Sequence, residues 1–366
     1  MPDIRSLQRL IARQFGRRHV VLTGHGTTAI YLALKAIEAE TGRGEVLVSS
    51  VGCASLAQII EYAGFVPRFI DINLDDYTLD CGVLERAVTP SARAIMPVHL
   101  FGHATDMNRI MEIARQHALP VIEDAAQSLG GQYGGAKLGA IGDFGILSFG
   151  GSKIISAGGG GALLFDDDRH LKVIEAEVAA LPAFDRSSRI SLKALSHRNL
   201  YHGVVDLLRV DRGAKLYGVF RTTMASYREL YFHRFPKDDG IAERVEASLE
   251  SLPANLKARL ARAEQYYDLF ATLPIRQSDN WRRSGCVWRY TIMLRNAEET
   301  IRVTASLRRN NIHASNHYWS LADVFNADTS VLNASAFSPR VLNLWVDEVA
   351  NADYIRKSCR VIADSL

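Results

Sequence analysis

The sequence predicts an α/β protein in two parts: a large domain, residues 1–250, with a mostly parallel sheet between helices, and a small α+β domain, residues 251–366. Two observations carry this prediction. Runs rich in Val, Ile, Leu and Phe alternate with runs of helical period over about the first 170 residues. From about residue 180 the alternation stops, and strand-like runs return only near the C-terminus.

The large domain opens with an amphipathic helix at 1–16. Its expected strands are 19–24, 45–50, 66–72, 92–100, 119–126, 143–150 and 160–167, and its other expected helices are 27–42, 54–64 and 106–118. Strands that alternate with helices in this way form parallel sheets covered on both faces. Ligands of such sheets bind beyond the carboxyl ends of the strands.

A basic segment, residues 186–237, comes after the alternating strands and helices. It carries eleven Lys and Arg against three Asp and Glu, interleaved with Tyr and Phe. Solvated helices, a subunit contact and an anion-binding surface all remain open for it. A long helix at 242–273, with a kink expected near Pro253, leads to the C-terminal part. There, strands are expected at 287–294 and 340–346.

Composition excludes several classes of protein. A net charge of +3 is too small to indicate nucleic acid as a partner, and no run of about 18 apolar residues predicts a membrane span. The cysteines, Cys53, Cys81, Cys286 and Cys359, lack the spacing of metal ligands, which predicts reduced thiols. The N-terminal stretch has no apolar core of the signal-peptide type, so a cytoplasmic location is expected.

The stretch "TGHGTTA", residues 23–29, joins an expected strand to an expected helix. Glycines there let backbone N–H groups and the helix N-terminus face an anion, so the stretch is a candidate phosphate cradle. It also matches the dinucleotide pattern at Gly24, Gly26 and Ala29. A nicotinamide site would need an acidic residue after the next strand, and "VLVSSVGC" offers none.

Two charged residues at expected strand ends point to pyridoxal phosphate chemistry. Asp124 is either a helix N-cap or a carboxylate partner for a protonated ring nitrogen. Lys153, within "SFGGSKIISAGGGG", is either a surface lysine in a flexible loop or an amine that forms a Schiff base with an aldehyde cofactor. Burial and nearby positive charge would lower the pKa of such a lysine.

Residues 94–165 resemble the central block of the DegT/StrS-type sugar aminotransferases, which are pyridoxal-phosphate (PLP) enzymes of fold type I. The element E-D-A-A-Q is followed by S-F-x-x-x-K, whose serine lies 24 residues after Asp124. The resemblance is dense over 20–168 and thinner over 255–366, where "NNIHASNHYWSL" resembles a loop of the family's small domain. It implies an aspartate-aminotransferase-like large domain.

The resemblance implies a role for each matched residue. Lys153 is the Schiff-base lysine and the acid–base group, and Asp124 pairs with the pyridine nitrogen. The further residues implied to contact cofactor or substrate are Gln127 at the 3-hydroxyl, Ser148, Gly26 and Thr27 at the phosphate, Cys53 on the ring face, and His317 and Tyr318 at the substrate.

The implied function is a homodimeric aminotransferase of amino-sugar, polysaccharide or antibiotic biosynthesis, with glutamate as expected donor and a nucleotide-linked keto-sugar as acceptor. Cys53 stands where the family has an aromatic residue, and residues 235–242 lack its asparagine. A non-catalytic relative therefore stays open. A dehydratase using the amine form of the cofactor (PMP) is disfavoured, because that branch replaces the residue at Lys153 by histidine. A nicotinamide oxidoreductase is disfavoured by the missing acid.

Overall fold

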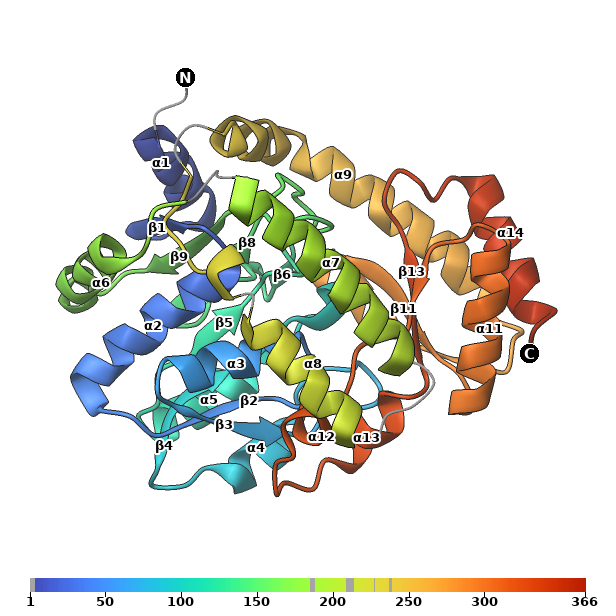
Figure 1. Cartoon of the computed structure of the whole chain (residues 1–366), viewed down its shortest axis with the longest axis horizontal. Coiled ribbons are helices and arrows are strands. Elements are labelled where there is room, and N and C mark those ends of the chain that lie inside the picture. Colours follow the sequence, from blue (N-terminus) through green and yellow to red (C-terminus); the bar gives the residue numbers. More distant parts are fainter. Residues whose placement is uncertain (1–3, 185–187, 209–213, 227, 237–238) are drawn as a thin grey trace.

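The protein is described by a computed structural model over residues 4–184, 188–208, 214–226, 228–236 and 239–366. Seven of the described strands form one mixed sheet (Figure 1). In sheet order they are β3 (Val66–Ile70), β2 (Glu45–Ser49), β4 (Ala92–Met96), β5 (Ile122–Asp124), β8 (Phe144–Ser148), β9 (Gly161–Phe165) and β1 (His19–Thr23). Only β9 runs against its neighbours, which confirms the predicted mostly parallel sheet.

Helices pack around this sheet. They are α1 (Ile4–Phe15), α2 (Gly26–Thr41), α3 (Ala54–Tyr62), α4 (Cys81–Ala87), α5 (Met107–Gln116) and α6 (Asp168–Ala180). The helix α2 contacts β8, β9, α3 and α6, and it is apolar on most sides because it lies between the sheet and other helices. The short elements η1 (Leu100–Gly102), β6 (Gln132–Tyr133) and β7 (Ala136–Lys137) connect the strands.

The basic segment folds mainly as helices, α7 (Ser188–Leu208), α8 (Ala214–Ser226) and η2 (Arg228–Leu230). Its end residues Arg186 and Lys237 lie outside the described residues. Figure 1 shows α7 and α8 crossing the front of the molecule, and α8 contacts α3 and the later helix α12 (Leu321–Phe325). The chain then passes beside β1, where Gly24 N donates to His233 O at 3.0 Å.

A 30-residue helix, α9 (Ile241–Phe270), contains Pro253 and leads into the C-terminal part. There, β10 (Arg276–Gln277), β11 (Arg289–Met293), β13 (Val341–Trp345) and β12 (Ala314–Ser315) form an antiparallel sheet in that order. The remaining helices are α10 (Asn280–Ser284), α11 (Ala297–Arg309), α13 (Leu332–Phe337) and α14 (Ala352–Ala363). The expected strands near 287–294 and 340–346 thus form the centre of this sheet.

The chain has two hydrophobic cores that divide within α9. Leu252 belongs to the core around the large sheet, whereas Ala263 belongs to the core beneath the C-terminal sheet. The later segment from Tyr318 to Val341 packs back onto the first core. We therefore propose a domain boundary near residue 250, with that segment returning to the large domain.

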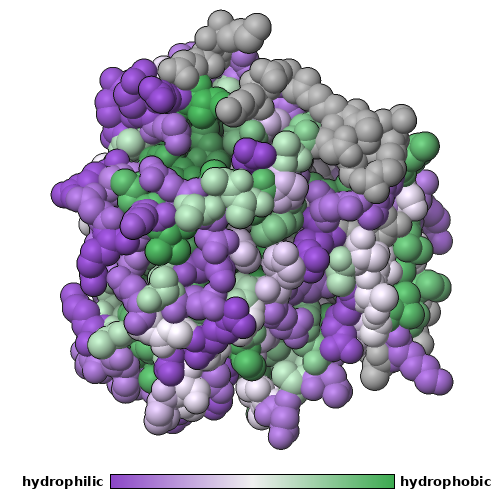
Figure 2. Space-filling view, turned by 60° about the vertical axis from the view of Figure 1, so that its left-hand side comes forward, coloured by the Kyte–Doolittle hydropathy of each residue, from purple (hydrophilic) through white to green (hydrophobic). Residues whose placement is uncertain are grey.

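The molecular surface is largely hydrophilic on the side that carries α2 and α6. Figure 2 shows charged and polar side chains over most of this face, with smaller apolar patches between them. Among the described residues, no helix is long and apolar enough to cross a membrane.

Candidate active site

Three strands of the large sheet end at the same edge and present polar residues there. Thr23, Asp124 and Ser148 are the last residues of β1, β5 and β8, which run in the same direction. Loops that follow the carboxyl ends of neighbouring parallel strands come together, so these residues define one site.

The stretch 23–29 forms a tightly packed cradle at this edge. Gly26 is the first residue of α2, and a Cβ on it would lie 3.2 Å from Ser148 Cβ. A Cβ on Gly161 would lie 2.6 Å from Gly26 N, so the glycine permits two backbone segments to approach each other. The N-terminus of α2 lies at this edge, and a helix N-terminus suits a phosphate.

His25, inside the same stretch, was not singled out from the sequence. Its ring lies 5.1 Å from the ring of Tyr231 and 6.0 Å from that of His233. Burial, and then the charges of His233 and Lys153, lower the pKa of His25 to about 3. The imidazole beside the cradle is therefore neutral at physiological pH. Its position in a Gly-x-Gly turn was the available signal.

Asp124 is buried and has one oxygen free for a ligand. Its Oδ1 accepts from Ala126 N at 2.9 Å, and its Oδ2 accepts no hydrogen bond from a described residue. Burial raises the pKa of Asp124 above its ordinary value, although the Ala126 N–H and the charges of Lys153 and His99 act in the opposite direction. A cationic N–H donor placed at Oδ2 would restore the ionised form.

Gln127 links the large domain to the loop that carries Tyr318. Its Oε1 accepts from Phe101 N at 2.8 Å, and its Nε2 donates to the Tyr318 hydroxyl at 3.1 Å. The Tyr318 ring lies edge-on to that of Phe101, at 4.7 Å. The structure therefore brings Gln127 and Tyr318 together, although they are far apart in sequence.

Lys153 lies in a loop that backbone contacts hold in place. Ser152 has a left-handed φ of 66°, and its carbonyl accepts from Trp288 Nε1 at 2.6 Å. Lys153 Nζ is 5.6 Å from the centre of the Trp288 ring. Burial lowers the pKa of Lys153, the charges of Asp124 and Cys53 oppose this effect, and Arg289 adds to it. The amine is thus more easily deprotonated than that of an ordinary lysine.

Cys53 and His317 lie at the margin of the site. The exposed Cys53 accepts a hydrogen bond from Ser55 Oγ at 3.0 Å, and it acts electrostatically on Lys153 and Tyr318. His317 Nδ1 is 2.9 Å from Ser315 Oγ. The His317 ring stacks beside Tyr318 at 5.9 Å, so both expected substrate residues share one loop.

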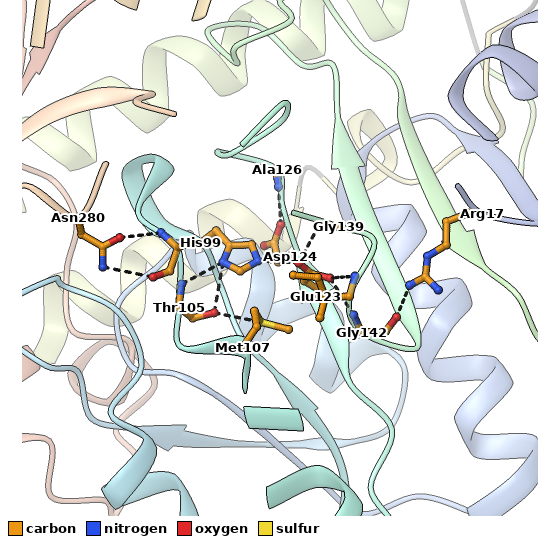
Figure 3. A network of polar contacts seen from close by, with 12 residues as sticks. Arg17, His99, Thr105, Met107, Glu123, Asp124, Ala126, Gly139, Gly142 and Asn280 are labelled. Carbon is orange, nitrogen blue, oxygen red and sulfur yellow. Dashed lines mark hydrogen bonds and ion pairs between the residues drawn. The ribbon is translucent and has the colours of Figure 1, made fainter. Parts of the chain in front are cut away.

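A buried polar network surrounds Glu123, the residue before Asp124 (Figure 3). Thr105 N donates to His99 Nδ1 at 3.2 Å, so His99 carries its proton on Nε2 and donates to Glu123 Oε1 at 2.9 Å. Glu123 also accepts from the backbone N–H groups of Gly139, Ile141 and Gly142.

Burial by itself raises the pKa of Glu123, but the bonds from His99, Gly142 and Gly139 outweigh it and hold the pKa below its ordinary value. The Glu in E-D-A-A-Q was the sequence signal for this network.

A cavity of about 490 Å³ opens beside the cradle. Thr27, Ser55 and Tyr231 line one part of it, and Arg221 and Arg228 of the basic segment line another. The Arg228 guanidinium lies 3.8 Å from the centre of the Tyr62 ring. The cavity therefore combines aromatic surface with cations next to the predicted phosphate residue Thr27.

The sequence model of the DegT/DnrJ/EryC1/StrS aminotransferase family matches residues 2–186. GDP-perosamine synthase of Caulobacter vibrioides is 41% identical over 161 residues, which are 44% of this chain and 43% of that protein. A UDP-N-acetyl-3-dehydro-alpha-D-glucosamine 3-aminotransferase of Acidithiobacillus ferrooxidans is 39% identical over 168 residues, which are 46% of this chain and 45% of that protein. The chain thus spans less than half the length of these relatives.

Two solved structures share the fold of the whole chain. The aminotransferase PseC of Helicobacter pylori superposes with a TM-score of 0.77 at 16% identity, covering 98% of this chain and 90% of PseC. The sugar aminotransferase CalS13 of Micromonospora echinospora superposes with a TM-score of 0.76 at 21% identity, covering 100% of this chain and 92% of that one. At these identities the likeness shows the fold, including the C-terminal part that the family match does not reach.

Proposed function

Because this chain belongs to the DegT/DnrJ/EryC1/StrS aminotransferase family, we propose that it is a PLP-dependent aminotransferase. It moves an amino group from an amino acid, with glutamate as the expected donor, to a keto-sugar. The observation that carries the proposal is that Lys153, whose pKa is lowered, and Asp124, a buried carboxylate with one free oxygen, lie close enough to act on each other electrostatically.

The residues at the sheet edge suit PLP. The cradle around Gly26 has no room for larger side chains and presents the α2 N-terminus, which favours a phosphate. Asp124 Oδ2 is available to a protonated pyridine nitrogen, whose charge would also offset the cost of burying that carboxylate. Gln127, Ser148 and Thr27 complete the proposed cofactor contacts.

When bound, PLP supplies an aldehyde that reacts with amines and a ring that withdraws electrons from the donor's Cα. The chain supplies the proton transfers. Lys153 Nζ, whose pKa is lowered by burial, would accept the proton from Cα and return it to a neighbouring carbon. Asp124 would hold the protonated ring nitrogen of a bound cofactor, since an ionised carboxylate there favours the charged form.

The acceptor is proposed to be a nucleotide-linked keto-sugar. Relatives named for GDP- and UDP-linked sugars support this choice. The cavity with Arg221 and Arg228 supports it independently, because Arg binds phosphate oxygens in a planar, bidentate way and aromatic surface suits a base. His317 and Tyr318 would then contact the sugar.

The proposal is tested by trapping and by turnover. The purified protein, incubated with PLP and reduced with borohydride, should carry the cofactor on the peptide that contains Lys153. Mass spectrometry should then detect amino transfer from glutamate to one member of a panel of nucleotide-linked keto-sugars. A protein that binds PLP at another lysine, or that transfers no amino group from any amino acid, would contradict the proposal.

A homodimer in the cytoplasm stays a prediction within this proposal. Four exposed leucines of α7, Leu192, Leu195, Leu200 and Leu207, are the kind of surface that a second subunit would cover. Light scattering of the active protein should give twice the 40.5 kDa of one chain. A fully active monomer would rule out the dimer.

A further inference from the structure

The C-terminal sheet presents a buried cation to the ring that Lys153 also contacts. Arg289, the first residue of β11, is only 3% exposed. Its Cζ atom lies 4.7 Å from the centre of the Trp288 ring and 4.2 Å from that of Trp345. Lys153 Nζ lies 5.6 Å from the Trp288 ring, and Arg289 acts electrostatically on Lys153, so the two cations lie near each other beside this ring.

The guanidinium of Arg289 is incompletely paired. Its Nη1 donates to Trp288 O at 3.2 Å and to Asp347 Oδ2 at 3.4 Å. Nε and Nη2 donate to no described residue, yet neither is fully sealed from solvent. A buried guanidinium is costly unless its N–H groups find acceptors. The unused N–H groups are therefore available to a ligand that can supply acceptors.

The local charge balance favours an anion at that place. Arg259, also buried, donates to the same carbonyl oxygen, Trp288 O, at 3.2 Å. Asp347 is the acidic group that acts on both arginines, while Glu348 acts only on Arg259. Burial lowers the pKa of Arg289 to about 10, which still leaves it charged at neutral pH. Two cations that share mainly one carboxylate leave positive charge for a ligand to neutralise.

We propose that Arg289 binds a carboxylate of the amino-acid donor through Nε and Nη2. Two tryptophan rings limit the rotation of its planar fork, so the bidentate geometry that carboxylates prefer is set before the donor arrives. Trp288 fixes the distance between this anion site and Lys153, because it also bonds the carbonyl of Ser152. This inference rests on the proposed aminotransferase function and names how its donor is recognised.

Kinetics of the cofactor-loaded protein test the assignment. Arg289→Gln should raise the KM for glutamate by roughly 10- to 100-fold, because a charged hydrogen-bonded pair is lost. The KM for the keto-sugar should change less than about threefold. Arg289→Lys should recover part of the glutamate affinity, since lysine keeps the charge and loses the fork.

A matched control comes from the same part of the fold. Arg262 donates to Val346 O at 3.2 Å, next to Asp347 in sequence, and its side chain contacts no described residue of the site. Arg262→Gln should leave both KM values unchanged. If Arg289→Gln fails to fold by circular dichroism, Arg289→Lys alone decides, by whether its KM for glutamate rises.

Donor analogues identify the carboxylate. In the parent, one of the two amides of glutamate, the α-amide or the γ-amide, should bind weakly, because it lacks the carboxylate that Arg289 binds. The affinity of that amide should change little in Arg289→Gln. Direct binding of glutarate, followed by calorimetry, should weaken in the variant and so report on the site without turnover.

Three outcomes overturn the inference. An unchanged glutamate KM in Arg289→Gln would make Arg289 a purely structural residue. A rise confined to the keto-sugar KM, seen with a sugar that carries its own carboxylate, would assign the arginine to the acceptor. An equal loss in Arg262→Gln would indicate a general effect on the domain. A parent protein that transfers no amino group would instead defeat the proposed function, which separates the two failures.

Discussion

The loops at the strand ends and the helices of residues 188–226 border the same site but obey different constraints. At the strand ends, a Cβ on Gly161 would collide with Gly26 N, and Glu123 must accept three backbone N–H groups. Very few residue types satisfy such demands. The helices α7 and α8 need only an apolar side, which many sequences provide, and the family match ends at residue 186, before α7 begins at Ser188.

The second region nevertheless reaches the chemistry. Phe220 of α8 packs edge-on against Trp319 at 4.8 Å, directly after Tyr318. The Tyr231 hydroxyl lies 2.8 Å from His197 Nδ1 of α7, and the Tyr231 ring contacts His25. The comparison therefore separates a strictly specified edge, which we propose to be catalytic, from a covering pair of helices that can vary. Substitutions at the edge should have large effects, and those in the helices should have smaller ones.

The largest effect should come from Lys153→Ala. Removal of an acid–base group costs typically 10²–10⁴-fold in rate, and loss of amine exchange with the cofactor adds to this. The variant should still bind PLP through Asp124 and the cradle, but borohydride should no longer attach it. Steady-state turnover and peptide mass spectrometry measure both.

Lys137→Ala is the matched control, because Lys137 lies over the Phe15 ring, outside the site. Activity of Lys153→Ala within a few-fold of the parent would show that the strand edge is not the catalytic region.

Glu123→Gln should give the next largest effect, on stability. Three backbone N–H groups and His99 Nε2 share the two carboxylate oxygens of Glu123, and the amide of Gln keeps only one acceptor oxygen. We therefore expect the free energy of unfolding to fall by about 3 kcal/mol. Because the folded-state pKa of Glu123 is lowered, its contribution is present above the ordinary pKa of a Glu and lost as the pH falls through the folded value.

Urea unfolding at neutral and acidic pH checks this prediction. The difference between parent and Glu123→Gln should shrink toward acidic pH. Glu112→Gln, which removes an exposed ion pair with Arg109, should cost less than about 1 kcal/mol. Equal losses of unfolding free energy in the two variants would mean that the network around Glu123 stabilises the fold no more than an exposed ion pair.

A smaller effect is expected from the helical region, for Arg228→Gln. If Arg228 contacts the phosphates of a nucleotide-linked substrate, the variant should raise the KM for that substrate about 5- to 10-fold at low salt. The difference should fade as ionic strength rises, whereas PLP affinity should not follow it. Lys193→Gln, at the Lys193–Glu229 ion pair, is the control. Equal salt sensitivity of substrate and cofactor binding would favour a subunit contact instead.

The sequence indicated the proposed catalytic edge more clearly than the residues that surround it. Residues with one strict use, such as Lys153 after a small-residue run and Asp124 at a strand end, could be recognised from their neighbours. Trp288 and Arg289 could not be recognised in this way. The sequence of a strand does not indicate that its side chains reach a site formed by another domain. His25 was not predicted as a site residue, because the turn that contains it was interpreted from its glycines alone. The two helices of the basic segment were left open, since charge alone does not distinguish a partner from a substrate.

The smallest effect should come from Cys53→Phe, at the border between the two regions. Cys53 is exposed, follows the loop after β2, and acts electrostatically on Lys153 and Tyr231, so a larger side chain there can extend over the cofactor ring. Aromatic stacking is worth about 0.5–1.5 kcal/mol. PLP affinity, measured by equilibrium dialysis, should therefore stay equal or improve by up to about tenfold, while Cys53→Ser should keep most of its turnover. Loss of turnover in Cys53→Ser with PLP still bound would make the thiol a catalytic group and extend the strictly specified edge to β2.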